Sequence, residues 1–192
     1  MNAEVDVSGI CLETPRVRLR AWKESDLQDL FDYASMEDIG RMAGWKRHTC
    51  LEESSAILQL FIQEKKTFAI ECKENGKVVG SIGLEPLKAD VEQAYPSAKG
   101  REIGYVLHKD NWGKGMMPEA VREVIRYCFE EEHYDFLCCG HFNFNHQSQR
   151  VIEKLGFRYW KDAWFSTQYN DGEAGKLYVL TKEEYERKVK DL

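Results

Sequence analysis

The stretch DNWGKGMMPEAVREVIRYCFEE, which begins at Asp110, places Gly113 and Gly115 around a lysine, directly ahead of an amphipathic segment. In that segment apolar residues recur at the spacing of one helix face, and charged residues occupy the other face. Pro118 suits the first turn, where its missing N–H has no partner in any case. Residues 102–108, just before the loop, are expected to form a strand. The sequence therefore predicts a strand, a glycine loop and a helix in succession, with an apolar stripe of Val121, Val124, Ile125, Cys128 and Phe129.

The glycine loop fits only the most general of three phosphate-binding patterns. A Walker loop requires G-x-x-x-x-G-K-[ST], which this stretch does not contain. A dinucleotide fingerprint requires a third glycine where Pro118 stands, and an acidic residue about 20 positions further on, which is also missing. The remaining pattern is a helix N-terminus whose free N–H groups face an anion that bare glycine backbone allows to approach. A capped helix that binds nothing is an equally good interpretation of the loop alone.

The rest of the chain predicts a mixed sheet with helices on it, in a single domain over residues 1–192. Asn75-Gly76 is a strong hairpin signal between two strands. Residues 88–100 are polar and are expected to form a long loop. The expected strands are residues 17–20, 67–72, 77–84, 102–108, 135–142, 163–169 and 176–181, and the expected helices are residues 25–34, 52–63, 118–129 and 147–155. This order is α+β and differs from a doubly wound sheet.

Composition and charge exclude several classes of protein. Hydrophobic residues make up 43% of the 192 residues, yet no apolar run approaches the roughly 18 residues that cross a bilayer. The acidic N-terminus lacks the basic region of a signal peptide, so a cytoplasmic protein is expected. The six cysteines have neither disulfide-framework nor metal-site spacing, and no metal is expected. A net charge of −6 disfavours nucleic acid and suits a small cationic or amine substrate.

The block REIGYVLHKDNWGKGMMPEAVREVIRYCFEEEHYDFLCCGHFNFNHQSQRVIEKLGFRY closely resembles the GCN5-related N-acetyltransferases (GNAT), in particular the branch that acetylates ribosomal-protein N-termini. ETPRVRLRAWKESDL resembles the first strand and helix of that branch, and YVLTKEEY its last strand. The resemblance implies a mixed, mostly antiparallel seven-stranded sheet with about four helices. It also implies that the sheet splays into a V between residues 102–108 and 136–142.

The resemblance further implies that acetyl-CoA lies in the V, with its pantetheine arm pairing like an extra strand with residues 105–108. The pyrophosphate loop of the family, Q/R-x-x-G-x-G/A, falls on residues 112–117, where Gly115 matches and Trp112 and Met117 depart from the pattern. Asn143 and Asn145 either hydrogen-bond the pantetheine amides or form turns. The expected cofactor-binding residues are Tyr105, Val106, Leu107, His108, Trp112, Gly113, Lys114, Gly115, Met116, Met117, Pro118, Asn143, Asn145 and Ser148.

Catalytic residues follow from the same resemblance. Asn145-x-x-Ser148 matches the Asn and Ser of the family, and the position one turn on, often a tyrosine acid, is Ile152. Ser148 is therefore the expected proton donor, and a helix-cap serine is the alternative. Glu102 matches a glutamate proposed as base through a water, and a charged strand end is the alternative.

Two further residues are expected on the acceptor side. Trp45 lies in the segment that covers the acceptor in this family, where it either walls the substrate or packs under a loop. His141 has a useful pKa of about 6.5, although a packed strand histidine is the plainer interpretation. Arg150 and Lys154 either approach the cofactor phosphates or form a solvated helix face.

Two functions from different classes remain open at this point. One is an acetyl-CoA-dependent N-acetyltransferase whose primary-amine acceptor, a small molecule or a peptide, attacks directly in a ternary complex. A protein N-terminus, a polyamine or amino acid, and an aminoglycoside-like toxin are the acceptors considered. The other is a non-catalytic acyl-CoA-binding sensor or interaction module. In either case we expect a monomer or homodimer without a nucleic-acid or membrane partner.

Overall fold

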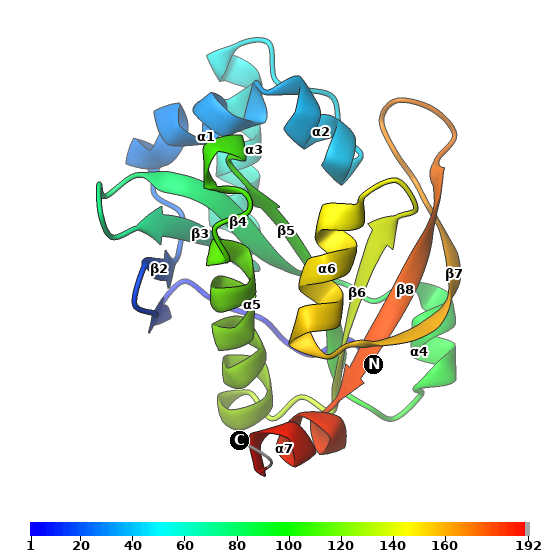
Figure 1. Ribbon diagram of the computed structural model, residues 1–192. Helices are drawn as coiled ribbons and strands as arrows, with labels where there is room; N and C mark the ends of the chain where they lie inside the picture. Colours follow the sequence, from blue (N-terminus) through cyan, green and yellow to red (C-terminus); the bar gives the residue numbers. More distant parts are fainter. Residues whose placement is uncertain (191–192) are drawn as a thin grey trace.

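The computed structural model describes residues 1–190 and contains one eight-stranded sheet. The strands are β1 (Cys11–Glu13), β2 (Val17–Arg20), β3 (Thr67–Cys72), β4 (Val78–Glu85), β5 (Gly100–Leu107), β6 (Phe136–Phe142), β7 (Arg158–Phe165) and β8 (Glu173–Thr181). Their order is β1-β2-β3-β4-β5-β6-β8-β7, and every neighbouring pair is antiparallel except β5 with β6. The predicted α+β class with a mostly antiparallel sheet is confirmed (Figure 1).

Helices cover both faces of this sheet. The α-helices of residues 1–190 are α1 (Leu27–Ala34), α2 (Glu37–Ala43), α3 (Leu51–Glu64), α4 (Ala89–Ala94), α5 (Met116–Arg126), α6 (His146–Leu155) and α7 (Lys182–Lys190). Phe68, Ile82 and Ile103 pack in one cluster with α5, whereas Ala69 packs in another with Leu58 of α3. We call these two sides the α5 face and the α3 face. Figure 1 shows α5 and α6 side by side in front of the sheet.

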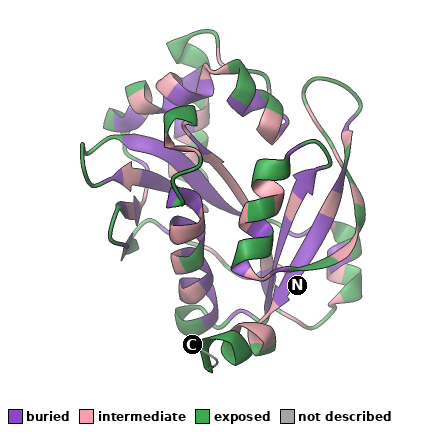
Figure 2. Cartoon of the chain, viewed as in Figure 1, coloured by how far each residue is buried: buried purple, intermediate pink, exposed green. Residues whose placement is uncertain are grey.

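The predicted strand–loop–helix unit is present, and α5 buries the predicted stripe. Val121, Val124, Cys128 and Phe129 are fully buried, and Ile125 is 2% exposed. Burying each of the larger side chains contributes about 1.5–3 kcal/mol. The helix continues as a π-helical turn over Tyr127–Glu131. Figure 2 shows buried residues along one side of α5 and exposed or partly exposed residues along its other side.

The predicted hairpin between β3 and β4 is also present. Gly76 has φ +72°, which a residue without a Cβ adopts readily, and the Lys77 amide donates to Asn75 Oδ1 at 3.1 Å. These local contacts turn the chain back so that β3 and β4 pair antiparallel.

The prediction of seven strands and about four helices was too low. The short strand β1 pairs only with β2 and was missed. Residues 88–100, predicted as a loop, contain α4, which forms because Val91 is fully buried among β6 and β8 residues. The strand predicted at 163–169 is β7 and begins at Arg158. Its side chains are mostly exposed, so pairing with β8 rather than a hydrophobic pattern determines its extent.

Strands β5 and β6 pair over only part of their length. Gly100 to Ile103 pair in parallel with Phe136 to Cys139, and the pairing stops there. Beyond Ile103 and Cys139, residues 104–107 of β5 do not pair with residues 140–142 of β6. The strands diverge at this point, as Figure 1 shows, which gives the predicted V between them.

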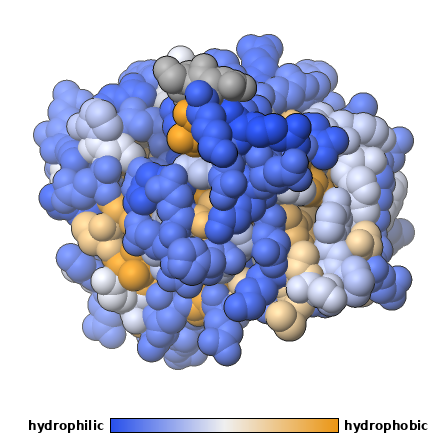
Figure 3. Space-filling view, turned by 90° about the horizontal axis from the view of Figure 1, so that it is seen from below, coloured by the Kyte–Doolittle hydropathy of each residue, from blue (hydrophilic) through white to orange (hydrophobic). Residues whose placement is uncertain are grey.

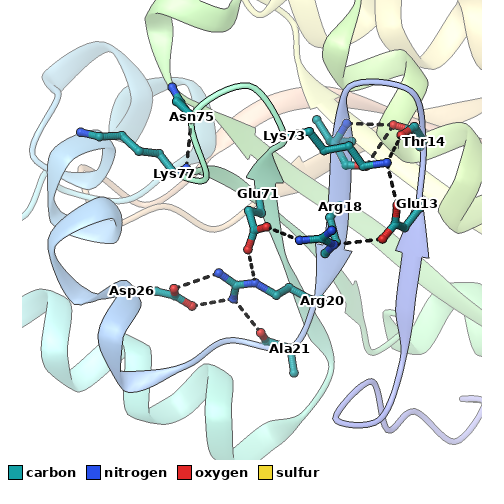
Figure 4. A network of polar contacts seen from close by, with 11 residues as sticks. Glu13, Thr14, Arg18, Arg20, Ala21, Asp26, Glu71, Lys73, Asn75 and Lys77 are labelled. Atoms are coloured by element: carbon teal, nitrogen blue, oxygen red, sulfur yellow. Dashed lines mark hydrogen bonds and ion pairs between the residues drawn. The ribbon is translucent and has the colours of Figure 1, made fainter.

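An ion-pair network joins β2, β3 and the start of α1 (Figure 4). The Arg20 guanidinium donates to both carboxylate oxygens of Asp26, at 2.8 and 3.0 Å, and to Glu71 at 2.6 Å. Arg18 donates to the other oxygen of Glu71 at 2.7 Å. Burial alone would raise the pKa of Glu71, but the two arginines outweigh it and hold that pKa below its usual value.

Within residues 1–190, none of the helices combines the length and the apolar composition that crossing a bilayer requires. The face seen in Figure 3 is mostly hydrophilic, with hydrophobic residues visible only in small separate areas.

Candidate active site

The V between β5 and β6 opens into a cavity of about 670 Å³. Side chains alternate between the faces of a strand, and the cavity is lined both by Tyr105 on the α5 face and by Glu102 and Gly104 on the α3 face. It therefore passes through the splayed sheet and is open to both faces. The helix α6 and the glycine loop border it on one side, and α2 with the segment after it on the other.

The glycine loop lies at one end of this cavity. Gly113 and Gly115 have φ +72° and +75°, the left-handed region that favours glycine. The first backbone hydrogen bond of α5 runs from the Glu119 amide to the Gly115 carbonyl, at 3.3 Å. In the described part of the chain, the amides of residues 113–117 donate no hydrogen bond. These free donors at a helix N-terminus are arranged as an anion site requires.

Arg16, which the sequence analysis did not single out, braces the loop from the turn between β1 and β2. Its Nη1 donates to the Lys114 carbonyl at 2.7 Å, and its Nε donates to Glu119 at 2.6 Å. A Cβ on Gly115 would lie 3.6 Å from Arg16 Nη2. Because Glu119 also accepts from the Thr14 hydroxyl, the turn, the loop and the first turn of α5 form one connected unit.

Ser148 faces the cavity from the first turn of α6. Its Oγ lies 2.9 Å from the Tyr105 hydroxyl, which also approaches the Ser148 carbonyl at 3.2 Å. The residue that caps α6 is Asn145, whose Oδ1 accepts from the Ser148 amide at 3.0 Å. Asn145 Nδ2 donates to the Met42 carbonyl at 3.0 Å and so ties α6 to α2. The cap interpretation therefore applies to Asn145, and the Ser148 hydroxyl remains directed at Tyr105.

Burial raises the pKa of the Tyr105 phenol well above its usual value. Cys139 adds to this shift and the hydrogen bond with Ser148 opposes it. Tyr105 therefore stays protonated at neutral pH and can hold a proton next to Ser148.

Glu102 lines the cavity directly opposite Glu85 in the β4–β5 ladder. Burial raises the pKa of Glu102 above its usual 4.5. Lys88 opposes this shift, whereas Glu85 and Asp90 add to it. A half-buried carboxylate with a raised pKa binds a proton more readily than an ordinary one, as a general base requires.

Trp45 and His141, the two residues predicted on the acceptor side, both line the cavity. His141 is 5% exposed, with Nδ1 2.8 Å from the Phe142 carbonyl and Nε2 3.3 Å from the Tyr178 hydroxyl. Both of its ring nitrogens thus have protein partners, as a packed histidine does. Trp45 follows α2 and lies with its ring centroid 5.6 Å from that of His48.

The structure brings most of the predicted cofactor residues to the cavity and leaves three aside. The predicted residues that line it are Tyr105, Val106, Leu107, Trp112, Gly113, Gly115, Met116, Met117, Pro118, Asn145 and Ser148, and Arg150 and Lys154 line it as well. His108 instead accepts from the Asp110 amide, and Asn143 lies in a separate groove beside Trp164. Lys114 is exposed and does not line the cavity, and its backbone carbonyl accepts a hydrogen bond from Arg16.

Among residues 1–190, no group of three or more His, Cys, Asp or Glu side chains could hold a metal ion. The cysteines of this region are free thiols, and burial raises the pKa of Cys138 and of Cys139. They lie in the sheet as small apolar residues.

A sheet splayed beside a glycine loop at a helix N-terminus is the arrangement that the resemblance to acetyl-CoA-dependent acyltransferases implies. The acetyltransferase (GNAT) domain profile matches residues 16–158. The chain is 32% identical to the probable N-acetyltransferase YjcK of Bacillus subtilis strain 168, over 70% of each chain. It is 27% identical to the uncharacterized N-acetyltransferase YoaA of the same organism, over 77% of this chain and 82% of that one. The chain belongs to the GNAT acetyltransferase family.

Solved structures show the same fold at low sequence identity. An acetyltransferase of the GNAT family from Bacillus anthracis has a TM-score of 0.77 at 20% identity, covering 91% of this chain and all of that one. The ribosomal-protein-S5-alanine acetyltransferase from Vibrio fischeri has a TM-score of 0.71 at 21% identity, with 92% and 98% covered. Microcin C7 self immunity acetyltransferase MccE, solved with acetyl-CoA and AMP, has a TM-score of 0.73 at 14% identity, with 88% and 93% covered.

Proposed function

We propose that this protein transfers the acetyl group of acetyl-CoA to a primary amine by direct attack in a ternary complex. One observation carries the proposal. A single cavity begins at the unpaired amides of the glycine loop, passes through the V and ends at Glu102 on the opposite face of the sheet. Such a path lets the two substrates enter from opposite faces and meet where the strands diverge.

The residues present suit the cofactor. The free amides of residues 113–117 would hold the diphosphate, and no Cβ at Gly113 or Gly115 would keep it at a distance. The unpaired edge of residues 104–107 would hold the amides of the pantetheine arm as a strand holds its neighbour. Arg150 and Lys154, which line the same side, would add positive charge. Bound there, the cofactor supplies an acetyl thioester.

Proton transfer would involve Glu102 on one face of the sheet and the Ser148–Tyr105 pair on the other. An α-amine of pKa about 8 is roughly 10% neutral at pH 7, and a lysine of pKa about 10.4 is neutral below about 0.1%. Glu102 would take the proton of the incoming ammonium through a water, after which the C–N bond forms as the C–S bond breaks. Ser148 would give its proton to the departing thiolate and recover one through its 2.9 Å contact with Tyr105. The second proton of the attacking nitrogen would leave to water as the amide forms, and Tyr105 would regain its proton from water.

Several primary amines could serve as the acceptor. The V. fischeri neighbour supports, as an analogy of fold, an acceptor such as a ribosomal-protein N-terminus. A free polyamine or amino acid and an aminoglycoside-like toxin fit the same chemistry. We place the reaction in the cytoplasm and expect a monomer or homodimer.

Thiol release from acetyl-CoA with a panel of amines, with the products identified by mass spectrometry, tests the proposal. We expect release of coenzyme A to depend on the amine and to match the amount of acetylated product. The rival function is a non-catalytic acyl-CoA sensor. Tight cofactor binding without acetylation of any amine, including peptides with free N-termini, would favour that rival.

A further inference from the structure

The α3 face of the sheet carries a hollow inside the cavity. Gly83 of β4 and Gly104 of β5 lie directly opposite each other in the ladder, so both strands present only main chain at this point. Thr67 of β3 pairs with Gly83 in the next step across the sheet. All three residues line the cavity. The hollow therefore has a floor of bare backbone with one hydroxyl at its edge.

Two carboxylates border this floor. Glu85 and Glu102 are the next opposed pair in the same ladder, on the same face as the two glycines. A Cβ on Gly83 would lie 2.6 Å from Glu85 Oε1 and 3.6 Å from Thr67 Oγ1, so the carboxylate and the hydroxyl flank the same glycine. Like charges directly opposite each other in a sheet are destabilising. A cation between them would relieve that repulsion.

The lysines nearby do not fully compensate the pair. Lys66 bonds Glu85 at 2.7 Å, but it also bonds Glu64 at 3.0 Å and so divides one charge between two acids. Lys88 faces Glu102, and its ammonium lies 3.7 Å from the centroid of the Phe165 ring.

One further acid belongs to this surrounding. Asp90 also faces Glu102, and it forms an ion pair with Lys161. Counting these groups together with their ion-pair partners gives four acids, Glu64, Glu85, Asp90 and Glu102, against three lysines, Lys66, Lys88 and Lys161. The hollow is thus left with a negative charge that its own protein does not neutralise.

Thr67 provides an independent observation. It is 3% exposed, and its Oγ1 has no hydrogen-bond partner among the described residues, although it borders the cavity. An unsatisfied buried hydroxyl destabilises the folded protein. Such a group is retained at a cost in stability unless a ligand supplies the missing partner.

From these observations we infer that the hollow is the acceptor subsite. It takes an acceptor that carries a positive charge, and no carboxylate of its own, near the amine that reacts. Glu85 holds the cation, and Thr67 hydrogen-bonds the acceptor. This inference rests on the proposed acetyl transfer and adds the charge of its acceptor. The lining supports it, because Glu85 and Glu102 lie on the α3 face, whereas Arg150 and Lys154 belong to α6, beside the cofactor side. The two substrates are thereby sorted by charge.

Three four-carbon amines test the charge preference. We expect kcat/KM to fall in the order butane-1,4-diamine, butan-1-amine, 4-aminobutanoate, whose far ends are an ammonium, a methyl group and a carboxylate. Glu85→Gln should raise KM for the diamine about tenfold, the lower end of what a hydrogen bond to a charged group contributes. KM for acetyl-CoA should not change. A preference for 4-aminobutanoate, or an unchanged KM for the diamine, would overturn the inference.

Glu64→Gln is the matched control for Glu85→Gln. It makes the same change of charge at the other partner of Lys66, but Glu64 does not line the cavity. We expect its KM for the diamine to stay within about twofold of the wild type. An equal rise in both variants would show a general effect of charge and would overturn the assignment of Glu85.

Thr67→Val separates a ligand contact from a structural role. Because Thr67 Oγ1 has no partner in the free protein, valine should leave the melting temperature unchanged or raise it, while KM for the diamine increases. A lower melting temperature with an unchanged KM would refute the role of Thr67.

Calorimetry distinguishes failure of this inference from failure of the acetyl transfer. Butane-1,4-diamine is titrated into protein saturated with coenzyme A, which has no acetyl group to transfer. Binding that Glu85→Gln weakens supports the subsite even if no amine is acetylated. Absence of binding overturns the subsite even if other amines are acetylated.

Discussion

The hydroxyl of Tyr105 on β5 lies 2.9 Å from Oγ of Ser148 on α6, across the opening of the V. This contact joins the two walls of the cavity through a pair of groups that can both donate and accept a proton. Ile152 occupies the position one turn beyond Ser148, so the tyrosine that contacts Ser148 comes from β5 instead of from α6.

Ser148→Ala should lower kcat about 100-fold with little change in KM for acetyl-CoA, because it removes the donor to the thiolate. Tyr105→Phe should lower kcat less, since Ser148 keeps its own proton. Pre-steady-state measurement of thiol release checks both variants where chemistry limits the rate. Equal rates in Ser148→Ala and the wild type would remove Ser148 from the mechanism.

Gly115→Asp should abolish acetyl-CoA binding, because it places a carboxylate where the diphosphate is expected. Gly76→Asp is a matched control, since Gly76 has φ +72° and an added Cβ there meets nothing within 4 Å. Both variants should lose about 1 kcal/mol of stability from the left-handed backbone. Calorimetric titration should show the loss of binding in Gly115→Asp only, and full affinity in that variant would refute the loop assignment.

Arg16→Ala should raise KM for acetyl-CoA about three- to tenfold and leave kcat nearly unchanged, because the loop loses its brace while the reacting groups are untouched. Arg122→Ala, an exposed arginine of α5, is the control with the same change of charge. If both variants raise KM equally, the effect comes from net charge and the brace has no role.

Glu102→Gln should remove the acid limb of the pH profile of kcat/KM. A base must be ionised, so the rate falls as pH drops through its pKa, and burial places that pKa above 4.5. The amine contributes a separate rise at higher pH, through its own pKa of about 8–10. Profiles recorded from about pH 4 to pH 10 cover both limbs. An acid limb that persists in the variant would exclude Glu102 as the base.

Arg20→Met should destabilise the fold by about 3 kcal/mol at pH 7, because Asp26 and Glu71 lose their shared cation while largely buried. Arg18→Met, at a more exposed arginine, should cost less stability than Arg20→Met. The lowered pKa of Glu71 stabilises the fold fully above about pH 4.3, and this contribution disappears as pH falls through the folded value. Urea denaturation at pH 7 and at low pH should therefore show a smaller effect of Arg20→Met in acid.

The elements that could be predicted from sequence have local causes. The turn at Gly76 and the glycine loop before α5 each depend on residues a few positions apart, and the stripe of α5 has a clear period. The residues 88–100 and β7 were harder to predict because distant contacts determine them. Burial of Val91 among β6 and β8 residues fixes α4, and pairing with β8 fixes β7.

The same distinction applies to the site. Ser148 and the glycine loop stand in a recognisable order along the chain, so resemblance located them at the cavity. Arg16 and Lys114 are 98 positions apart and meet only in the fold. Glu85 ends β4, and only the antiparallel register sets it opposite Glu102. The sequence around Glu85 contains no motif that predicts this cross-strand pair.

The partial pairing of β5 with β6 has a mechanical consequence. The two halves of the sheet are hydrogen-bonded to each other through only four residues of β5 and four of β6. A pantetheine arm in the gap would join the two halves, because it would pair with the edge of β5 that β6 does not cover. The two halves of the sheet would then be less tightly held before the cofactor binds and after it leaves. The rate of coenzyme A release would depend on how readily β5 and β6 separate.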